Sequence, residues 1–426
     1  MPPSKSARHV ALDGLSQIIG EGRMLSDVVA DADWQSLSGA ERATAQRLIV
    51  QTLRSLGPAD HVLGPLLQRQ LPLRVMNLLR MATVELMAGG AAHGVVNEAV
   101  TLASRNRKTA PLKGMVNAVL RNVTRLEPEV WQDAPVTRLP KWLRNRLVKA
   151  WGKSAVAAME QTFSQTPPVD VSVIDAPEEW AKQLGATVLP TGSLRLGTSQ
   201  QISALPGFES GAWWVQDAAA ALPVKLLGDV TGLRVLDICA APGGKTMQLA
   251  AAGADVTALD ISEKRMARVS ENLMRTGLNA DLVTADALTY KAAPFDAILL
   301  DAPCSATGTI RRHPDLPYVK SQTSVEALVA LQRKLLTHCL GLLKPGGRLV
   351  FCTCSLLPEE GELQIANLLS EQLDIKVLEM TPPGCDPAWR SDEGGMRLRP
   401  DYWSDIGGMD GFYMAVLQKA SDSSLG

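Results

Sequence analysis

The stretch LRVLDICAAPGGKTMQLAAAGADVTALD, residues 233–260, decides the fold of the second half of the chain. An apolar run ends at Cys239, a glycine-containing loop follows, and residues 244–252 have the composition of a helix. A second apolar run ends at Asp260. A strand, a helix and a strand in this order predict two parallel neighbours in one sheet.

The same alternation continues toward the end of the chain. Strands are predicted at 280–286, 295–303, 347–354 and 412–418, and helices at 215–227, 263–277, 324–343 and 359–369. This pattern predicts an α/β, Rossmann-like domain over 212–420, with a largely parallel sheet covered by helices on both faces. Ligands of such sheets bind beyond the carboxyl ends of the strands.

The first part of the chain has a different organisation. Residues 1–127 contain helical periodicities only, with breaks at Gly57-Pro58, Leu71-Pro72 and Gly89-Gly90, and they predict an all-α bundle. A basic helical linker is expected at 128–164. Short extended runs between turn residues predict a small α+β module at 165–211. We therefore expect a multi-domain protein.

Composition narrows the class of protein. The chain has 426 residues, 46% of them hydrophobic, and neither a bilayer-spanning apolar run nor a signal-peptide core is evident. We expect a cytoplasmic monomer with no membrane contact. In that compartment the six cysteines are not expected to form disulfides. The five histidines lack ligand spacing and no CxxC pair exists, so no metal site is predicted.

Positive charge is concentrated in one region although the whole chain has a formal net charge of −1. Residues 99–159 contain twelve Lys or Arg against three acidic residues, a local balance of +9. The basic residues are Arg105, Arg107, Lys108, Lys113, Arg121, Arg125, Arg138, Lys141, Arg144, Arg146, Lys149 and Lys153. Such a region is typical of a surface that faces a polyanion, although a solvated helix face has the same composition.

The glycine loop is compatible with two classes of ligand. Gly244, Lys245 and Thr246 match the end of a phosphate-binding P-loop, which would indicate a nucleotide triphosphatase. However, Cys239 stands where that motif begins with glycine, and Pro242 removes a backbone donor. Acidic residues at successive strand ends, Asp260 and Asp286, favour a nucleoside cofactor whose ribose and base they can contact. These features favour S-adenosyl-L-methionine over ATP.

Two further strands deliver thiols to the same edge of the sheet. Cys304 follows ILLDAP and Cys354 follows RLVFCT. A thiolate that adds to C6 of cytosine makes C5 nucleophilic enough to accept a methyl group. A carboxyl group that donates a hydrogen bond or proton to the ring would stabilise this adduct, and Asp301 suits that role. Cys239, Cys339 and Cys352 are interpreted as structural thiols.

CAAPGGKT, DAPCSATG and the Thr-Cys-Ser of FCTCSLLPEEGE resemble, in order, the signature blocks of the RNA cytosine-5 methyltransferases. The resemblance implies that Cys354 is the nucleophile, that Cys304 assists product release and that Asp301 contacts the target base. It also implies cofactor contacts by Cys239, Ala240, Ala241, Pro242, Gly243, Gly244, Lys245, Asp260, Asp286 and Asp301. Position 352 is a mild departure, because a non-cysteine residue often stands there in the family.

The first helices extend the resemblance. VNEAVTLASRNRKTAPLKGMVNAVLRNV, residues 96–123, is similar to the end of a NusB-type RNA-binding domain, and its fusion to this core resembles the Sun/Fmu (RsmB) branch of the family. That branch implies methylation of one cytosine in 16S ribosomal RNA, and a ferredoxin-like fold for 165–211. A transfer-RNA substrate and a non-catalytic RNA-binding or transcription-associated factor remain alternatives.

The target base must be single-stranded or flipped out, because a stacked cytosine hides C6. Arg311, Arg312 and His313 follow Cys304 closely and are candidates for phosphate contacts. Trp213 and Trp214 could stack on a base, but aromatic residues in this position more often pack in the core.

Overall fold

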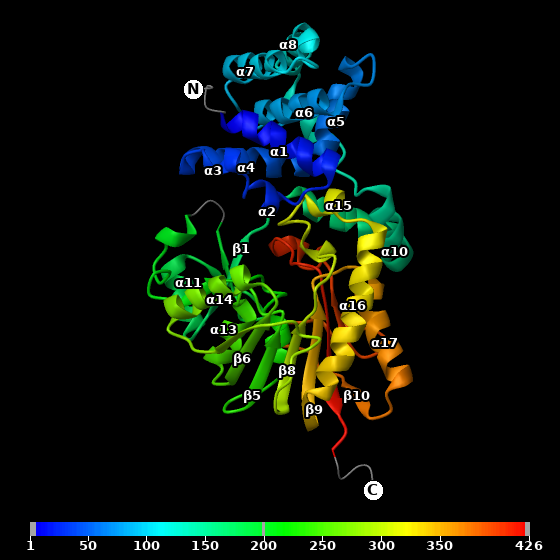
Figure 1. Cartoon of the computed structure of the whole chain (residues 1–426). Helices are drawn as coiled ribbons and strands as arrows, with labels where there is room; N and C mark the ends of the chain where they lie inside the picture. Colours follow the sequence, from blue (N-terminus) through cyan, green and yellow to red (C-terminus); the bar gives the residue numbers. More distant parts are fainter. Residues whose placement is uncertain (1–5, 198–200, 422–426) are drawn as a thin grey trace. The chain divides into compact units, whose positions relative to one another are not determined.

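A computed structural model describes residues 6–197 and 201–421, which separate into two compact units (Figure 1). The helical unit contains the described residues up to Thr166 together with Ile310–Ser321. The sheet unit contains the described residues of Pro167–Thr309 and those from Gln322 onward. The segment Ile310–Ser321 therefore leaves the sheet unit and returns to it, which the sequence did not predict.

The helical unit is a bundle around one apolar core, to which Leu15, Ile49 and Leu79 contribute side chains with no exposed surface. Local signals set the ends of its helices. Ser38 and Glu41 form a capping box at the start of α4, and Gly22, in the left-handed region with φ 69°, ends α1. Its helices are α1 (Ala7–Glu21), α2 (Leu25–Val28), α3 (Ala32–Gln35), α4 (Gly39–Arg54), α5 (Leu56–Leu63), α6 (Leu73–Met87), α7 (Ala92–Arg105), α8 (Lys113–Val123), α9 (Pro128–Gln132), α10 (Lys141–Ser164) and α15 (Leu316–Val319).

The small module at the start of the sheet unit is a four-stranded antiparallel sheet in the order β2-β3-β1-β4 with one helix. A buried ion pair joins two of its strands, because Arg195 Nε lies 2.7 Å from Asp170 Oδ1. The elements are β1 (Val169–Val173), α11 (Pro177–Leu184), β2 (Thr187–Val188), β3 (Leu194–Leu196) and β4 (Trp213–Val215). This architecture confirms the α+β module predicted from the short extended runs.

The main sheet has the order β10-β12-β9-β8-β5-β6-β7, with β11 paired to β12. The pairs among β7, β6, β5, β8 and β9 are parallel, whereas β12 is antiparallel to β9, β10 and β11. The strands are β5 (Arg234–Ile238), β6 (Asp255–Asp260), β7 (Asp281–Thr284), β8 (Phe295–Asp301), β9 (Leu343–Thr353), β10 (Ile375–Leu378), β11 (Met396–Leu398) and β12 (Phe412–Lys419).

Helices cover both faces of this sheet (Figure 1). Leu300 packs in the cluster that contains Leu335 of α16, and its neighbour Leu299 packs in the cluster of the opposite face. This alternation is what a strand buried on both sides requires. The covering helices are α12 (Leu222–Leu226), α13 (Gly244–Ala251), α14 (Glu263–Thr276), α16 (Gln322–Gly341) and α17 (Glu362–Glu371).

The predicted fold class is confirmed: an N-terminal helical bundle, a small α+β module and a Rossmann-like domain. The helix expected at 215–227 is wrong in extent, because β4 ends at Val215 and α12 begins only at Leu222. The division of the chain into four segments is finer than the division into two units and stays a prediction. Among the described residues, no helix combines the length and apolar character needed to cross a bilayer.

Candidate active site

The glycine loop lies at the carboxyl end of β5, as expected. Cys239 takes the left-handed conformation with φ 61°, which is costly for a residue with a side chain. Gly243 has φ 101°, and a Cβ there would lie 3.1 Å from the side chain of Val269. Glycine therefore permits both the turn and the close approach of the loop to α14.

A cavity of about 490 Å³ opens where β5, β6, β7, β8 and β9 end. Its volume is within the ordinary range for small-molecule sites, and most of its wall is apolar. It is lined by Cys239, Ala241, Leu259, Asp260, Ile261, Arg265, Ala285, Asp286, Ala287, Leu288, Asp301, Ala302, Pro303, Cys304, Ala306, Leu331, Leu335 and Cys354. An apolar cavity with a few acidic groups at strand ends fits a nucleoside cofactor of the size of S-adenosyl-L-methionine.

Two of these acids are fixed by the backbone around them. Asp260 Oδ1 accepts a hydrogen bond from the backbone N–H of Ser262 at 3.0 Å, and Asp286 Oδ1 accepts one from that of Leu288 at 2.9 Å. The side chain of Asp260 also lies 3.4 Å from Nη1 of Arg265. Both carboxylates therefore have fixed orientations at the cavity wall before any ligand binds.

The two thiols predicted to act together are in contact. The Sγ atoms of Cys304 and Cys354 lie 3.5 Å apart, and both side chains are half-buried at the cavity. The hydrogen bond with Cys354 and burial raise the pKa of Cys304 well above its ordinary value. Cys304 therefore holds its proton at neutral pH.

Asp301 lies between the thiols and the glycine loop. Its Oδ2 accepts a hydrogen bond from Lys245 Nζ at 2.7 Å, and its Oδ1 accepts one from Cys352 Sγ at 3.6 Å. Burial lowers the pKa of Lys245, but the charge of Asp301, its hydrogen bond and the charges of Cys352 and Asp237 together outweigh burial, and this pKa is raised. Asp301 is thus a hydrogen-bond acceptor held by a cation, and a donor role at the base requires that it first take up a proton.

The structure brings together only part of the predicted site. Asp301, Cys304 and Cys354 line one cavity with the predicted cofactor residues Cys239, Ala241, Asp260 and Asp286. The remaining predicted residues, Ala240, Pro242, Gly243, Gly244 and Lys245, do not line it. Lys245 reaches the site through Asp301, and Ala240 is only 7% exposed within an apolar cluster.

Sequence reasoning missed several residues at the site. Ile261 and Arg265 line the cavity beside Asp260, and Ile261 is 70% exposed. Their position directly after an acidic strand end was the available signal. Glu360 was also missed: it is fully buried in the loop that carries Cys354 and bonds to Ser305 in the loop that carries Cys304, and its place in LPEEGE predicted only a helix start.

Other predicted contacts are limited by burial. Trp213 and Trp214 are 0% and 2% exposed, so they pack in the core, and stacking on a base is excluded in this structure. Arg311 is 1% exposed within the helical unit, which makes the expected phosphate contact wrong for this residue. Arg312 is half-buried and His313 is exposed.

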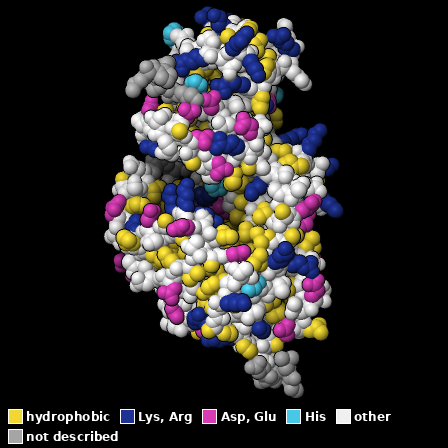
Figure 2. Space-filling model, viewed as in Figure 1, with side chains coloured by type: hydrophobic (Ala, Val, Ile, Leu, Met, Phe, Trp, Pro, Cys, Tyr) yellow, Lys and Arg dark blue, Asp and Glu magenta, His cyan; other side chains and the backbone are white. Residues whose placement is uncertain are grey.

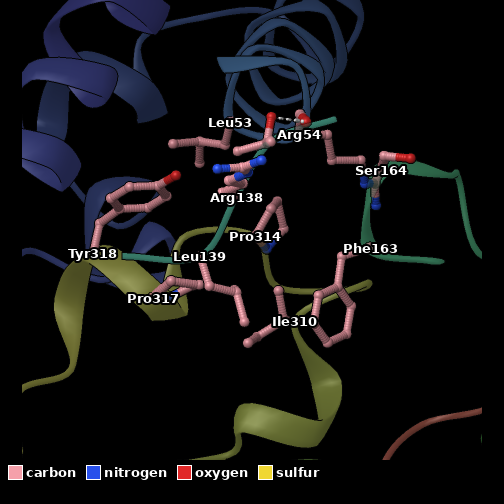
Figure 3. Close-up of a pocket in the computed structure, with 11 residues that line it drawn as sticks. Leu53, Arg54, Arg138, Leu139, Phe163, Ser164, Ile310, Pro314, Pro317 and Tyr318 are labelled. Carbon is pink, nitrogen blue, oxygen red and sulfur yellow. Dashed lines mark hydrogen bonds between the residues drawn. The ribbon is translucent and has the colours of Figure 1, made fainter. Parts of the chain in front are cut away.

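A second cavity, in the helical unit, is too small for a cofactor. Its volume is about 30 Å³, which admits a water molecule or two. Figure 3 shows Arg54 and Arg138 above Leu139, Pro317 and Ile310 around this cavity. Burial and the charge of Arg312 lower the pKa of Arg54 to about 10. The chemistry of the thiols and acids is therefore assigned to the larger cavity of the sheet unit.

Two family models match the chain, and they cover different parts of it. The model described as 16S rRNA methyltransferase RsmB/F matches residues 224–418, and the NusB family model matches residues 5–125. The first match contains the main sheet with the cavity, and the second contains the helices up to α8.

Similar proteins match over nearly the whole length. Ribosomal RNA small subunit methyltransferase B of Erwinia tasmaniensis is 35% identical over 98% of this chain and 100% of its own. The protein of the same name from Klebsiella pneumoniae is 34% identical over 88% of this chain and 92% of its own. A crystal structure of PH0851 has a TM-score of 0.72 at 23% identity, covers 98% of this chain and 99% of that chain, and so supports the fold.

Proposed function

Because the chain belongs to the RsmB/F family of methyltransferases, we propose that it methylates C5 of a specific cytosine in 16S ribosomal RNA through a covalent bond between Cys354 and C6. The observation that carries this proposal is the 3.5 Å separation of Cys354 and Cys304 at a cavity built for a nucleoside cofactor. A protein that only binds RNA has no need of two thiols in contact at such a cavity.

S-adenosyl-L-methionine is the cofactor of this family, and it supplies an activated methyl group. In this chain Asp260 and Asp286 would hold its ribose and base, because their carboxylates are fixed at the ends of neighbouring strands. Cys239 and Ala241 form the wall beside the glycine loop. Burial raises the pKa of Cys239 to about 12, so this thiol stays neutral and does not compete as a nucleophile.

Cys354 attacks first in the proposed reaction. Its thiolate adds to C6 of the flipped-out cytosine, a carbon–sulfur bond forms, and electron density moves to C5 and to the N3 and O2 edge. C5 is then nucleophilic enough to accept the methyl group. The Cys304 thiol is a poor rival for this attack because its raised pKa keeps it protonated.

Asp301 and Lys245 stabilise the charge that develops on the ring. Asp301 lines the cavity while Lys245 behind it carries the positive charge of the pair. Lys245 keeps its proton, because its pKa is raised, and its charge stabilises the adduct through Asp301; Asp301 donates to N3 only after it takes up a proton of its own. Asp301 is thus proposed to contact the target base.

Cys304 acts at the end of the reaction. After a base removes the C5 proton, the C5–C6 double bond forms again and the bond from C6 to Cys354 breaks. The departing thiolate is 3.5 Å from Cys304, which can donate a hydrogen bond to it. This contact is the proposed basis of product release.

The helical unit offers a surface for the RNA backbone. Lys and Arg side chains gather over α7, α8 and α10 in Figure 2. The exposed ones among those predicted are Arg105, Arg107, Lys108, Lys113, Arg121, Arg125, Arg138, Lys141, Lys149 and Lys153. Each phosphate that such a side chain neutralises strengthens binding independently of sequence.

Bisulfite sequencing of ribosomal RNA from cells with and without the protein tests this function. We expect one 5-methylcytosine in 16S ribosomal RNA to disappear with the protein and to return when the gene is restored. Loss of a 5-methylcytosine from transfer RNA instead, with 16S ribosomal RNA unchanged, would refute the ribosomal substrate.

A further inference from the structure

Two loops carry the thiols: the first thiol loop, residues 302–309 after β8, and the second thiol loop, residues 354–361 after β9. We propose that Glu360 is a positioning residue that clamps these two loops together and thereby sets the contact between Cys304 and Cys354. The inference deepens the proposed function and rests on it where catalysis is concerned.

The carboxylate of Glu360 is fully buried, and the hydrogen-bond donors that contact it are neutral groups. It is satisfied by hydrogen-bond donors from three segments. Oε1 accepts from the backbone N–H of Ser305 at 2.8 Å and from Gln332 Nε2 at 3.0 Å. Oε2 accepts from Ser355 Oγ at 2.6 Å and from Ser305 Oγ.

These contacts connect the two thiols through their nearest neighbours. Ser305 follows Cys304 directly, and Ser355 follows Cys354 directly. One carboxylate therefore bonds the residue after each thiol, so that a shift of either loop breaks hydrogen bonds among buried side chains. Buried polar networks of this kind impose one geometry because an unmade bond is costly there.

Further hydrogen bonds hold the rest of the network in place. Gln332 Nε2, which reaches from α16, also donates to the carbonyl of Pro303 at 2.9 Å. Thr307 Oγ1 accepts from the backbone N–H of Leu356 at 2.9 Å, and the backbone N–H of Gly308 donates to the carbonyl of Cys354 at 2.9 Å. The first thiol loop is thus fixed to the second along its length, with Glu360 at the centre.

The four donors match the four acceptor sites of an ionised carboxylate. In Glu360→Gln the amide nitrogen would face either the N–H groups of Ser305 and Gln332 or the two serine hydroxyls. In the first orientation the amide NH2 faces two N–H donors, so none of these groups has an acceptor. In the second orientation the NH2 faces the two serine hydroxyls, which must then find other acceptors. The substitution keeps the size of the side chain and changes only this pattern, so it isolates the clamp.

The charge of Glu360 has a second consequence for the first thiol loop. It adds to the effects of Cys354 and burial that raise the pKa of Cys304. The same side chain therefore places Cys304 beside Cys354 and helps to keep it protonated, as product release requires in the proposed reaction. A residue that only filled space in the core would do neither.

The rate of disulfide formation between Cys304 and Cys354 depends on their separation and can be measured without RNA or cofactor. A two-electron thiol oxidant such as diamide accepts two electrons and two protons as the S–S bond forms. Removing the charge of Glu360 lowers the pKa of Cys304 and by itself favours oxidation, so a slower reaction reports the changed geometry. The full chain carrying Glu360→Gln should form the Cys304–Cys354 disulfide at least about tenfold more slowly than the wild type. Glu371→Gln, which removes an exposed ion pair at the end of α17, is the matched control and should react at the wild-type rate.

Steady-state methylation gives a second, independent measurement of the effect of Glu360→Gln. With 16S ribosomal RNA, Glu360→Gln should lower kcat about 10- to 100-fold and change KM for RNA less than about threefold, because geometry rather than binding is altered. A disulfide rate or a kcat equal to that of the wild type overturns the clamp. A lower kcat with a wild-type disulfide rate also overturns it.

The clamp remains testable if Glu360→Gln fails to fold or if the proposed reaction is wrong. If Glu360→Gln does not fold, Ser305→Ala and Gln332→Leu each remove part of the donor set, and both should slow disulfide formation to a smaller degree; unchanged rates overturn the clamp. If Cys354→Ala retains methyl transfer, the proposed reaction fails, but the disulfide rates of the Glu360 variants still decide the clamp.

Discussion

Lys245 Nζ and Asp301 Oδ2 form an ion pair of 2.7 Å that joins the glycine loop to the strand end beside the thiols. The Lys245 side chain is almost buried, whereas Asp301 reaches the cavity. Because the cation lies behind the carboxylate, a substrate in the cavity contacts Asp301 and not Lys245. The positive charge of Lys245 balances the negative charge of Asp301 from the buried side. The pair is the electrostatic centre of the proposed site.

Lys245→Met should therefore lower kcat about 10²-fold, because it leaves Asp301 without the cation that balances it during catalysis. Steady-state methylation of 16S ribosomal RNA measures this effect. Lys344→Met is the control for loss of a Lys–Asp pair, since Lys344 forms a more exposed pair of 2.6 Å with Asp296 at the other end of β8. Equal losses in both variants would show that the effect is one of stability rather than of the site.

Gly308→Ala should separate the two thiol loops. A Cβ at Gly308 would lie 1.9 Å from the carbonyl oxygen of Gly411, so the backbone must move and the hydrogen bond from Gly308 to Cys354 must weaken. We expect methylation to fall at least about tenfold, together with a lower Tm. Gly341→Ala, where an added Cβ meets nothing within 4 Å, should leave both unchanged. Native activity in Gly308→Ala would contradict the tight contact.

Asp237 lies under the glycine loop and gives a test by pH. Burial raises the pKa of Asp237 to about 7, although Thr246 donates a 2.6 Å hydrogen bond to it. A raised carboxyl pKa favours the folded state at low pH, and this contribution is lost between the unfolded value near 4 and about pH 7. Between pH 5 and pH 8 the ionisation of Asp237 therefore lowers the free energy of unfolding by about 3 kcal/mol.

Asp237→Asn removes this titration and should therefore gain stability relative to the wild type as pH rises. The difference in Tm between variant and wild type, measured at pH 5 and at pH 8, should move several degrees in favour of the variant. A difference in Tm that is the same at both pH values would show that Asp237 is ionised throughout.

Salt dependence tests the surface of the helical unit. Replacing Lys113 and Arg121, both exposed on α8, by Gln should weaken binding of RNA and reduce the slope of log K against log salt by about 1.5. Arg333→Gln on α16 is a control of the same chemistry in the sheet unit. An unchanged slope in the α8 variant would show that Lys113 and Arg121 do not contact RNA phosphates.

Local patterns predicted the elements and the motif positions well. The carboxyl ends of parallel strands meet at one edge, so Asp260, Asp301, Cys304 and Cys354 could be placed together from alternation alone. Burial of Trp213 and Trp214 followed from the usual preference of aromatic residues.

Features that depend on distant contacts could not be predicted. Glu360 reads as a surface residue at the start of a helix, and only packing shows that its partners are Ser305 and Gln332. The segment Ile310–Ser321 follows the loop that carries Cys304, yet it folds with the helical unit, where Leu25 donates its backbone N–H to Asp315 at 2.9 Å. No local periodicity encodes such partners.

The central claim is that Cys354 bonds to the RNA base and that Cys304 is needed to release it. Cys304→Ala should be incubated with 16S ribosomal RNA and S-adenosyl-L-methionine and then separated on a denaturing gel. The RNA-linked protein should be digested and examined by peptide mass spectrometry. The account predicts a slow-migrating protein–RNA band and a methylated cytosine nucleotide attached to Cys354. Normal RNA binding with no such adduct, or an adduct on another residue, would contradict it.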